Sequence, residues 1–577
     1  MKKVGKKLVA ITGAIAMMSA MFAGCGEKAV EQQSSQPQES TSQVESSTPE
    51  ASSSSEEPVV EEFTYPMEGN HSFTALGMCI TGPKKYYGEA NMNLTEFTKE
   101  AERLTGIDIE IKHLPVTDKT NFNLAITEGN YPDVFEGLVA GNYTGGIAQA
   151  AIDGIIIPVE DLIDKYMPNL TALMEEYPII RAELTMDDGH IYAFPGVGVY
   201  PEQGHATNGL IIRTDWLQEC GLNMPTTIDE LYNVLVAFKE KYGASIVSQT
   251  NLVTQGTLVN AFCPNVSAMW GEDIETGEAY SLYTDDGYRE LLSTVAKWYA
   301  EGLIHPDFLT FAAADVRAKT LAGEVGVLWG MGGSTLNTML QEADANNVEI
   351  KVSAMGPIAK DKDSQVLYNN NGKHIQTTAN LFITDNCPEE KYEAICRYYD
   401  FMYTEEGIRL GNYGIEGVSY YINADGLETF TELMLHNPDG YTTVQMMGVY
   451  CRNHSSGYTG IQEYNYLRNY YMANYAASVA SDIWSAVPET SAPRTLDAAN
   501  YYTADEAEEI TVIKTDVDTY FKEMRAKFIY GELDVNDDAV WADYVKTMEN
   551  YGLGRWTEIV NSAVVKKAAA LKEFGVE

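Results

Sequence analysis

Positive charge is scarce in this chain. Lys and Arg number 39 against 83 Asp and Glu, which gives a formal net charge of −44 at pH 7. Nucleic-acid phosphates are recognised by clustered Lys and Arg, so this balance argues strongly against nucleic-acid binding. A polyanionic ligand would need a local basic pocket that overrides the average field. An acidic surface that keeps an exported protein soluble accounts for the charge.

Cysteine is scarce as well, with seven residues in 577. The six that follow Cys25 are Cys79, Cys220, Cys263, Cys387, Cys396 and Cys451. They are too sparse for a disulfide framework, and no CxxC pair is present to indicate zinc or redox chemistry. We expect most of them to be small buried apolar residues.

Motifs for catalysis and for metal binding are missing. The sequence has no GxSxG elbow, no HExxH, no phosphate-binding P-loop and no intact GxGxxG, and its eight His are scattered. "NNNGK" and "TDDG" are too short for a calcium loop and read as turns. We therefore expect no enzyme, no metal and no cofactor. A glycan hydrolase with two opposed carboxylates has almost no support, because any such pair can be found among so many acids.

The N-terminus reads as an export signal over residues 1–24. Lys2, Lys3, Lys6 and Lys7 precede an uncharged run from Leu8 to Phe22, which is shorter than the about 20 residues of a membrane-spanning helix. The pair Ala23-Gly24 before Cys25 looks like a lipobox, although Phe22 stands where that motif prefers Leu. Cys25 is thus the predicted lipidation site. The alternative is an ordinary signal peptide that happens to end at a cysteine.

Residues 25–64 are rich in Ser, Glu, Gln and Pro and have no aromatic residue before Phe63. Such a segment cannot bury enough apolar surface to offset the entropy of ordering, so it predicts a disordered tether. No second apolar run approaches membrane-spanning length, which predicts a soluble body. Two acyl chains on Cys25 would hold that body stably at the outer membrane surface.

The body is too long for one hydrophobic core, because domains usually contain about 50–250 residues. Strand and helix patterns alternate over about 95–195, which indicates an α/β lobe with a mixed or parallel sheet. The pattern restarts after a loop at 196–208. There Thr226-Thr227 precedes an amphipathic helix with Glu230 in its first turn. The C-terminal third is mostly helical.

An ordered set of segments carries a family resemblance: "GNYPDVFEG", "IIPVEDLIDKYMPN", "DDGHIYAFP", "LIIRTDWLQECGLNMPTTIDELYNVLVAFK", "GYRELLSTVAKWYAEGLIHPDF", "CPEEKYEAICRYYDFMYTEEGIRLGNYGIEG" and "TDVDTYFKEMRAKFIYGELD". Together they resemble the large extracellular solute-binding lipoproteins of Gram-positive ATP-binding-cassette (ABC) importers. Within that family they look like the LipO-like branch of aldouronate and oligosaccharide transport. The resemblance covers nearly all of the chain after residue 90.

The resemblance implies a two-lobe α/β clamp of the periplasmic-binding-protein kind, with a hinge, a central ligand cleft and a helix-rich C-terminal part. It places lobe 1 at 65–200 plus 374–418 and lobe 2 at 205–370 plus 420–577. Related members carry an Asp/Asn-rich calcium loop after the helix that matches 227–240, but here that place reads "KEKYGASIVSQTN", so calcium is not carried over.

The function implied is capture of a carbohydrate, most plausibly an oligosaccharide, by a monomer that delivers it to ABC permease subunits. A peptide or another small solute is the alternative ligand. Sugar recognition needs flat aromatic faces and polar groups for hydroxyl pairs. The candidate ligand-binding residues are Glu136, Tyr200, His205, Trp270, Trp329, Tyr420, Tyr421 and Trp484. Trp216, Trp298, Trp541 and Trp556 fall on helical faces and are expected in the core.

Overall fold

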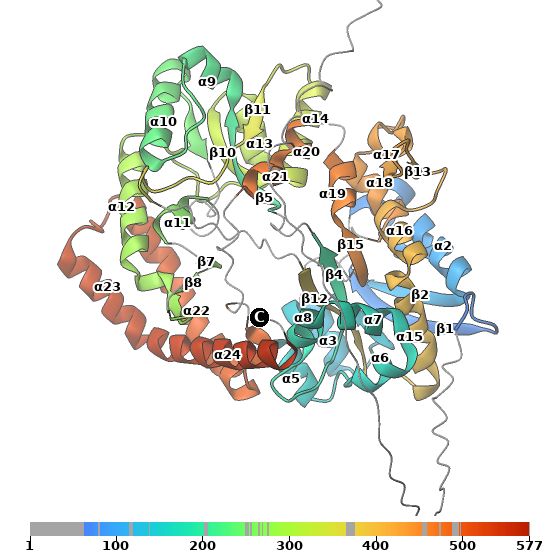
Figure 1. Cartoon of the computed structure of the whole chain (residues 1–577). Coiled ribbons are helices and arrows are strands. Elements are labelled where there is room, and N and C mark those ends of the chain that lie inside the picture. Colours follow the sequence, from blue (N-terminus) through green and yellow to red (C-terminus); the bar gives the residue numbers. More distant parts are fainter. Residues whose placement is uncertain are drawn as a thin grey trace, which may run out of the picture. The chain divides into compact units, whose positions relative to one another are not determined.

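The structure is a computed structural model (Figure 1). A mixed six-stranded sheet forms the centre of one half of the folded body. The structure describes residues 63–575 except 79–80, 115–118, 138, 201–205, 248–252, 254–256, 264–265, 268, 274–275, 365–374, 453–457, 472–474, 487–495 and 497. The predicted export signal, Cys25, nearly all of the predicted tether, and His205 lie outside the described residues.

The strand order of this sheet is β15-β4-β12-β3-β1-β2. The strands are β1 (His71–Met78), β2 (Ile107–Leu114), β3 (Val134–Glu136), β4 (Phe194–Val199), β12 (Ile375–Ile383) and β15 (Gly460–Glu463). β1 is parallel to β2 and β3, whereas β12 runs antiparallel to β3 and β4. The prediction of a mixed or parallel sheet over 95–195 is confirmed.

Alternating side chains bury both faces of the six-stranded sheet. Val134 and Phe135 are adjacent in β3 and enter two different hydrophobic clusters. One face is covered by α2 (Glu96–Thr105), α6 (Glu160–Tyr166), α7 (Pro168–Glu176), α8 (Pro178–Leu184), α15 (Tyr392–Asp400) and α16 (Glu405–Tyr413). The other is covered by α3 (Lys119–Thr127), α4 (Val139–Asn142) and α5 (Gly146–Ile152). Figure 1 shows β1 and β2 side by side, as their pairing requires.

A four-stranded sheet with the order β11-β5-β10-β6 organises the second half. Its strands are β5 (Asn208–Arg213), β6 (Ser245–Val247), β10 (Val325–Met331) and β11 (Val352–Ala354). One face shares a hydrophobic cluster with α9 (Thr214–Cys220), α10 (Ile228–Tyr242) and α12 (Asp286–Ala300). The same cluster continues into α22 (Ala504–Ile529), which packs on α12, and into α23 (Asp538–Asn550) and α24 (Leu553–Glu573), which pack on α22. The other face packs on α13 (Ala313–Leu321), α14 (Thr338–Ala345), α17 (Glu432–Leu435), α18 (Thr443–Tyr450), α19 (Tyr464–Tyr471), α20 (Tyr475–Ser478) and α21 (Ala480–Trp484).

Local sequence signals set several of these elements. Thr227 Oγ1 accepts a hydrogen bond from the Glu230 backbone N–H (3.2 Å), and the Glu230 carboxylate accepts one from the Thr226 N–H (2.8 Å), as predicted for the start of α10. The helical C-terminal third is confirmed by α22, α23 and α24. The structure also buries Trp216, Trp298, Trp541 and Trp556.

The last strand of the first sheet comes from far along the chain. β15 pairs in parallel with β4 and so lies in the six-stranded sheet, although the sequence placed 420–577 in the second lobe. The lobe ranges therefore stay a proposal, with β15 assigned to the first lobe. The short hairpin of β13 (Tyr420–Ile422) and β14 (Glu428–Phe430) begins where the predicted range of lobe 1 ends at 418 and that of lobe 2 resumes at 420.

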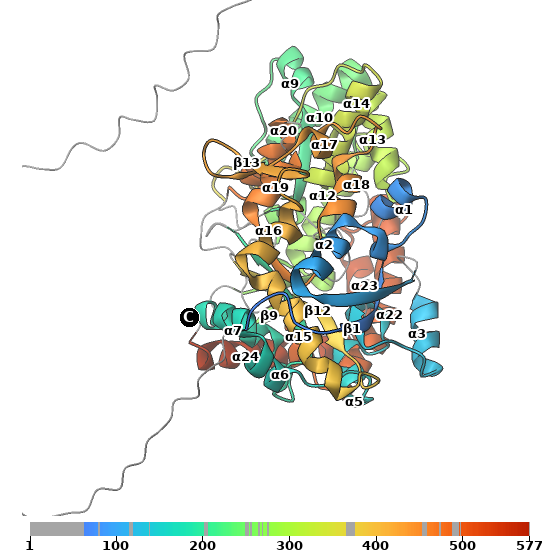
Figure 2. The ribbon, with the colours of Figure 1, turned by 90° about the vertical axis from the view of Figure 1, so that its right-hand side faces the viewer.

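A close helix contact ties α18 to the first sheet. α1 (Thr81–Tyr87) follows β1 directly and lies beside α18 (Figure 2). A Cβ on Gly82 would come within 2.6 Å of the Gln445 carbonyl oxygen, so only glycine allows this approach. The contact brings residues after α18 to the edge of the sheet at which β1 and β3 end.

The described cysteines are all free thiols. Cys263, Cys387, Cys396 and Cys451 are buried, and Cys220 is partly buried. This confirms, for four of them, the expectation of small buried apolar residues.

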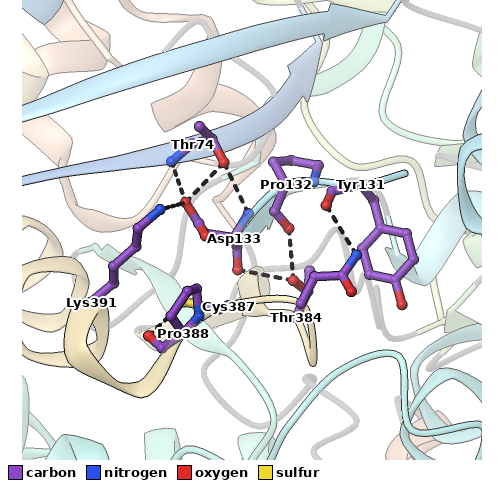
Figure 3. Close-up of polar contacts among 9 residues, drawn as sticks. Thr74, Tyr131, Pro132, Asp133, Thr384, Cys387, Pro388 and Lys391 are labelled. Carbon is purple, nitrogen blue, oxygen red and sulfur yellow. Dashed lines mark hydrogen bonds and ion pairs between the residues drawn. The ribbon is translucent and has the colours of Figure 1, made fainter. Parts of the chain in front are cut away.

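The buried Asp133 carboxylate holds the "PDVF" segment in position (Figure 3). Asp133 Oδ2 accepts hydrogen bonds from the Thr74 backbone N–H (2.7 Å) and Oγ1 (2.8 Å) and pairs with Lys391 Nζ at 2.8 Å. The Thr384 hydroxyl donates to the carbonyl oxygen of Pro132 at 2.7 Å. Asp133 thus joins β1, β3 and the entrance to α15.

Replacing this carboxylate should weaken the first lobe. We expect Asp133→Ala to lower the free energy of unfolding by about 3–5 kcal/mol, because it leaves the Lys391 ammonium and two Thr74 donors without their partner. Urea denaturation followed by circular dichroism measures it. Asp164→Ala is the control, since Asp164 is exposed and pairs with Arg181 on the surface, where such pairs contribute at most about 1 kcal/mol. Equal losses in the two variants would contradict this role.

Candidate ligand-binding site

The first candidate group lies where the parallel strands of the six-stranded sheet end. Ligands of open α/β sheets bind outside the carboxyl ends of such strands. Glu136, the last residue of β3, is 2% exposed; its Oε1 accepts a hydrogen bond from the Tyr399 hydroxyl at 2.7 Å and pairs with the Arg452 guanidinium. The predicted ligand contact of Glu136 stays a prediction, and the structure gives its carboxylate two buried partners.

His113, near the end of β2, belongs to the same edge. Its Nε2 accepts a hydrogen bond from the Met92 backbone N–H (2.9 Å), which requires an unprotonated Nε2. Burial lowers the pKa of His113; the nearby Glu136 charge raises it and the Arg452 charge lowers it. The fold therefore favours neutral His113.

Two predicted tryptophans lie near one end of the central strands β5 and β10, on opposite faces of the four-stranded sheet. Trp329 in β10 is paired with Leu210 of β5 and packs toward the cluster formed with α10 and α12. Trp484 lies on the other face, where its Nε1 donates to the Leu210 carbonyl oxygen at 3.0 Å. Gly209 leaves the space for the Trp484 ring. The two indoles therefore sandwich the start of β5.

The exposure of these two indoles differs in a way that matters for binding. Trp484 is 2% exposed and its nitrogen has a backbone partner. Trp329 is only partly buried, and its Nε1 has no hydrogen-bond partner in the part of the chain that the structure describes. A buried donor without a partner is costly, so Trp329 is the stronger candidate for a ligand contact.

The other predicted positions are spread over both halves. Tyr200 is buried after β4 and its hydroxyl donates to Gln462 Oε1 at 2.7 Å; burial raises the pKa of Tyr200 to about 12. Trp270 in β8 (Trp270–Glu272) packs edge-on against Trp556, with ring centres 5.2 Å apart. Tyr420 is buried in β13, whereas Tyr421 is 47% exposed. The structure does not bring these residues into one cluster with Glu136.

Two adjoining cavities lie between elements of the two sheets. The larger, of about 640 Å³, separates the start of α5 from one side of α22, and its lining includes Ala140, Gly146, Asn500, Lys514 and Asp518. The smaller, of about 250 Å³, is lined by Ala140, Ile147, Glu183, Leu184, Thr377, Thr378, Ala379, Asn500 and Lys567. Ala140, Ile147 and Asn500 line both. Small-molecule sites favour such concave places between domains.

α8 contacts α24 beside the smaller cavity (Figure 1). Polar side chains join the two segments. Lys567 of α24 is 2% exposed, and its Nζ lies 3.5 Å from Glu183 Oε1 of α8. The neighbouring Lys566 Nζ pairs with Asp187 Oδ1 at 2.6 Å. Asn500 Nδ2 donates to the Glu183 carbonyl oxygen at 2.6 Å. These residues were missed from sequence, because "VVKKAAALKE" reads as an ordinary amphipathic helix with exposed lysines.

Comparison with known proteins decides the family. The family of bacterial extracellular solute-binding proteins matches residues 92–408, more than half of the chain. The chain belongs to this family. The resemblance inferred from its segments is thereby confirmed, and this solute-binding protein has a two-lobe α/β fold. Members of the family bind solutes outside the cell and are not enzymes.

Individual relatives agree with this assignment. The fructooligosaccharide ABC transporter substrate-binding protein FusA of Streptococcus pneumoniae is 26% identical over 482 residues, covering 79% of this chain and 84% of the relative. Lipoprotein LipO of Bacillus subtilis is 26% identical over 366 residues, covering 59% of this chain and 66% of LipO. The crystal structure of alginate-binding protein AlgQ2 without calcium superposes with a TM-score of 0.67 at 22% identity, covering 87% of this chain and 100% of AlgQ2.

Membrane-spanning helices and metal-ligand groups are both absent from the described residues. Among them, no helix is both long and apolar enough to span a membrane. Nor does any group of three or more His, Cys, Asp or Glu in that part of the chain have the arrangement of a metal site.

The His113 environment predicts a pH dependence of stability. Its folded pKa lies below the ordinary value of about 6.5, so its contribution is fully present above that pH and is lost as the pH falls through the folded pKa. We expect His113→Gln to reduce the loss of unfolding free energy between pH 7 and pH 5, by about 1.4 kcal/mol per unit of pKa shift. Urea denaturation at both pH values measures it.

The comparison variant for this experiment is His190→Gln. The hydrogen bond to Glu160 raises the pKa of His190, so the contribution of His190 is present at low pH and this variant should enlarge the loss as the pH falls. If His113→Gln leaves the loss unchanged, His113 does not titrate with folding.

Proposed function

We propose that this solute-binding protein is the carbohydrate-capturing subunit of an ABC importer, anchored by lipid at Cys25. Lobe 1 (65–200 plus 374–418, with β15) and lobe 2 (205–370 plus 420–577) would close on an oligosaccharide and present it to the permease. The observation that carries the proposal is the match to FusA, whose name states a fructooligosaccharide ligand and of which this chain covers 84%. The protein would act as a monomer on the outer face of a Gram-positive cell membrane.

The interlobe cavities support this function. The larger has a volume of about 640 Å³, within the range of about 300–1,000 Å³ that is usual for small-molecule sites. Ala140 and Ile147 give both cavities an apolar side, while Asn500 gives both an amide. Mixed linings of this kind suit sugar rings, which have apolar C–H faces and a rim of hydroxyls.

Binding without turnover is the test of the proposal. Protein lacking residues 1–25 should bind one glycan per chain by isothermal titration calorimetry and release it chemically unchanged. At 100 times its Kd, the glycan should add about 2.7 kcal/mol to the free energy of unfolding and raise Tm. Hits from a peptide panel alone would favour the alternative ligand class, and cleavage of the glycan would overturn the assignment as a binding protein.

Trp329 is the aromatic contact that we test first. We expect Trp329→Ala to weaken glycan binding by about 2 kcal/mol, roughly thirtyfold, because a stacking face and an unpartnered donor are removed together. Trp329→Phe keeps most of the packing and should retain stability while losing the donor. Trp541→Phe, a core change in α23, is the control and should leave affinity unchanged. A loss of stability with intact affinity in Trp329→Ala would identify Trp329 as core.

Anchoring is tested separately through Cys25. Cys25→Ala should abolish labelling by a radioactive fatty acid and release the protein into the medium, because two acyl chains are needed for stable attachment. Cys220→Ala is the control, as Cys220 lies at the end of α9 in the folded body. Retention of label in Cys25→Ala would show that the cysteine is incidental to an ordinary signal peptide.

A further inference from the structure

The charged residues that line the smaller interlobe cavity indicate which kind of sugar it binds. Its charged lining groups are Glu183 and Lys567, one acid and one base. Both side chains are withdrawn from water, with 8% and 2% of their surface exposed, and their charged atoms lie 3.5 Å apart. In a setting of low polarity these opposite charges cancel locally, and each offers strong hydrogen bonds to a neutral partner.

We infer that this cavity holds a single uncharged sugar residue, at one end of the bound glycan. The inference rests on the proposed function. A volume of about 250 Å³ is small beside usual ligand sites and suits one ring rather than a chain. The adjoining cavity of about 640 Å³ shares Ala140, Ile147 and Asn500 with it and takes the next residues of the glycan.

The lining assigns a role to each side of the ring. Ala140, Ile147 and Leu184 provide an apolar surface for C–H groups, and the Glu183 carboxylate and Lys567 ammonium face sugar hydroxyls as acceptor and donor. The Lys567 charge is already compensated by Glu183, so the carboxylate of a uronic acid in this place would add a buried negative charge that has no cation of its own. The cavity therefore selects against an acidic ring.

Thr377 provides a second, independent observation. It lines the same cavity, and its Oγ1 is buried without a hydrogen-bond partner in the described part of the chain. Unpartnered buried hydroxyls are uncommon, and a sugar hydroxyl supplies the missing partner.

The chain offers a matched pair of double variants to test the cavity. Glu183→Gln with Lys567→Met removes the charged pair that lines it. Lys566→Met with Asp187→Asn removes the neighbouring pair, which joins the same two segments but lies outside the lining. Calorimetry with short neutral hexose oligosaccharides should show an affinity loss of about tenfold to a hundredfold in the first variant. The second should change affinity less than threefold.

Equal losses in both double variants would mean that the pairs act only by holding α24 to α8, and would overturn the cavity as a subsite. No loss in the first variant would overturn it as well. Thermal unfolding without glycan checks that each variant is folded.

Thr377→Val is a variant without any change of charge. It should leave Tm of the free protein unchanged, since no hydrogen bond is lost, and weaken binding of the neutral oligosaccharide about threefold to tenfold. Thr443→Val is its control, because the Thr443 hydroxyl is also buried without a partner among the described residues but lies in α18, outside the lining. Unchanged binding in Thr377→Val would remove Thr377 from the site.

Short oligogalacturonates test the charge selectivity in the same titrations. They should bind at least tenfold more weakly than neutral chains. Equal or tighter binding that depends on Glu183 and Lys567 would overturn the inference of an uncharged ring while leaving glycan import intact. Failure of the unchanged protein to bind any glycan would instead overturn the proposed function.

Discussion

A buried ion pair joins two points of the chain that are 316 residues apart, Glu136 at the end of β3 and Arg452 after α18. Removing one partner of such a pair typically costs about 3–5 kcal/mol, because the other charge stays buried without compensation. The two ends must therefore meet in every folded molecule. α18 is then held on α1, and β15, which begins at Gly460, pairs with β4 and forms the edge of the six-stranded sheet. The first lobe is completed by chain that passes through the second.

This long-range closure explains where sequence reasoning succeeded and where it stopped. The cap at Thr227 and the helical pattern of α22 are local, so a few neighbouring residues determine them. β15 is only four residues long, "GIQE", and has no alternation that marks a strand. It pairs with β4, which lies more than 250 residues earlier in the chain, so no local sequence pattern predicts the pairing.

The candidate site divides in the same way. An aromatic residue at the end of a buried strand, such as Trp329, can be proposed from sequence because strand ends and glycines are visible there. Lys567 could not, since adjacent lysines on an amphipathic helix look equally solvated until a partner helix covers one of them. α24 packs on α22 and α23 and also on α8, so neighbouring lysines differ in burial. Arg452 was hidden for the same reason.

The free thiols have a consequence for life outside the cell. An oxidising exterior attacks thiolates, and burial keeps the described core cysteines protonated; for Cys387 it raises the pKa to about 12. At neutral pH only on the order of one Cys387 thiol in 10⁵ is then ionised while the side chain stays buried. The fold itself therefore slows oxidation of these described thiols. Its chemical durability is a by-product of packing.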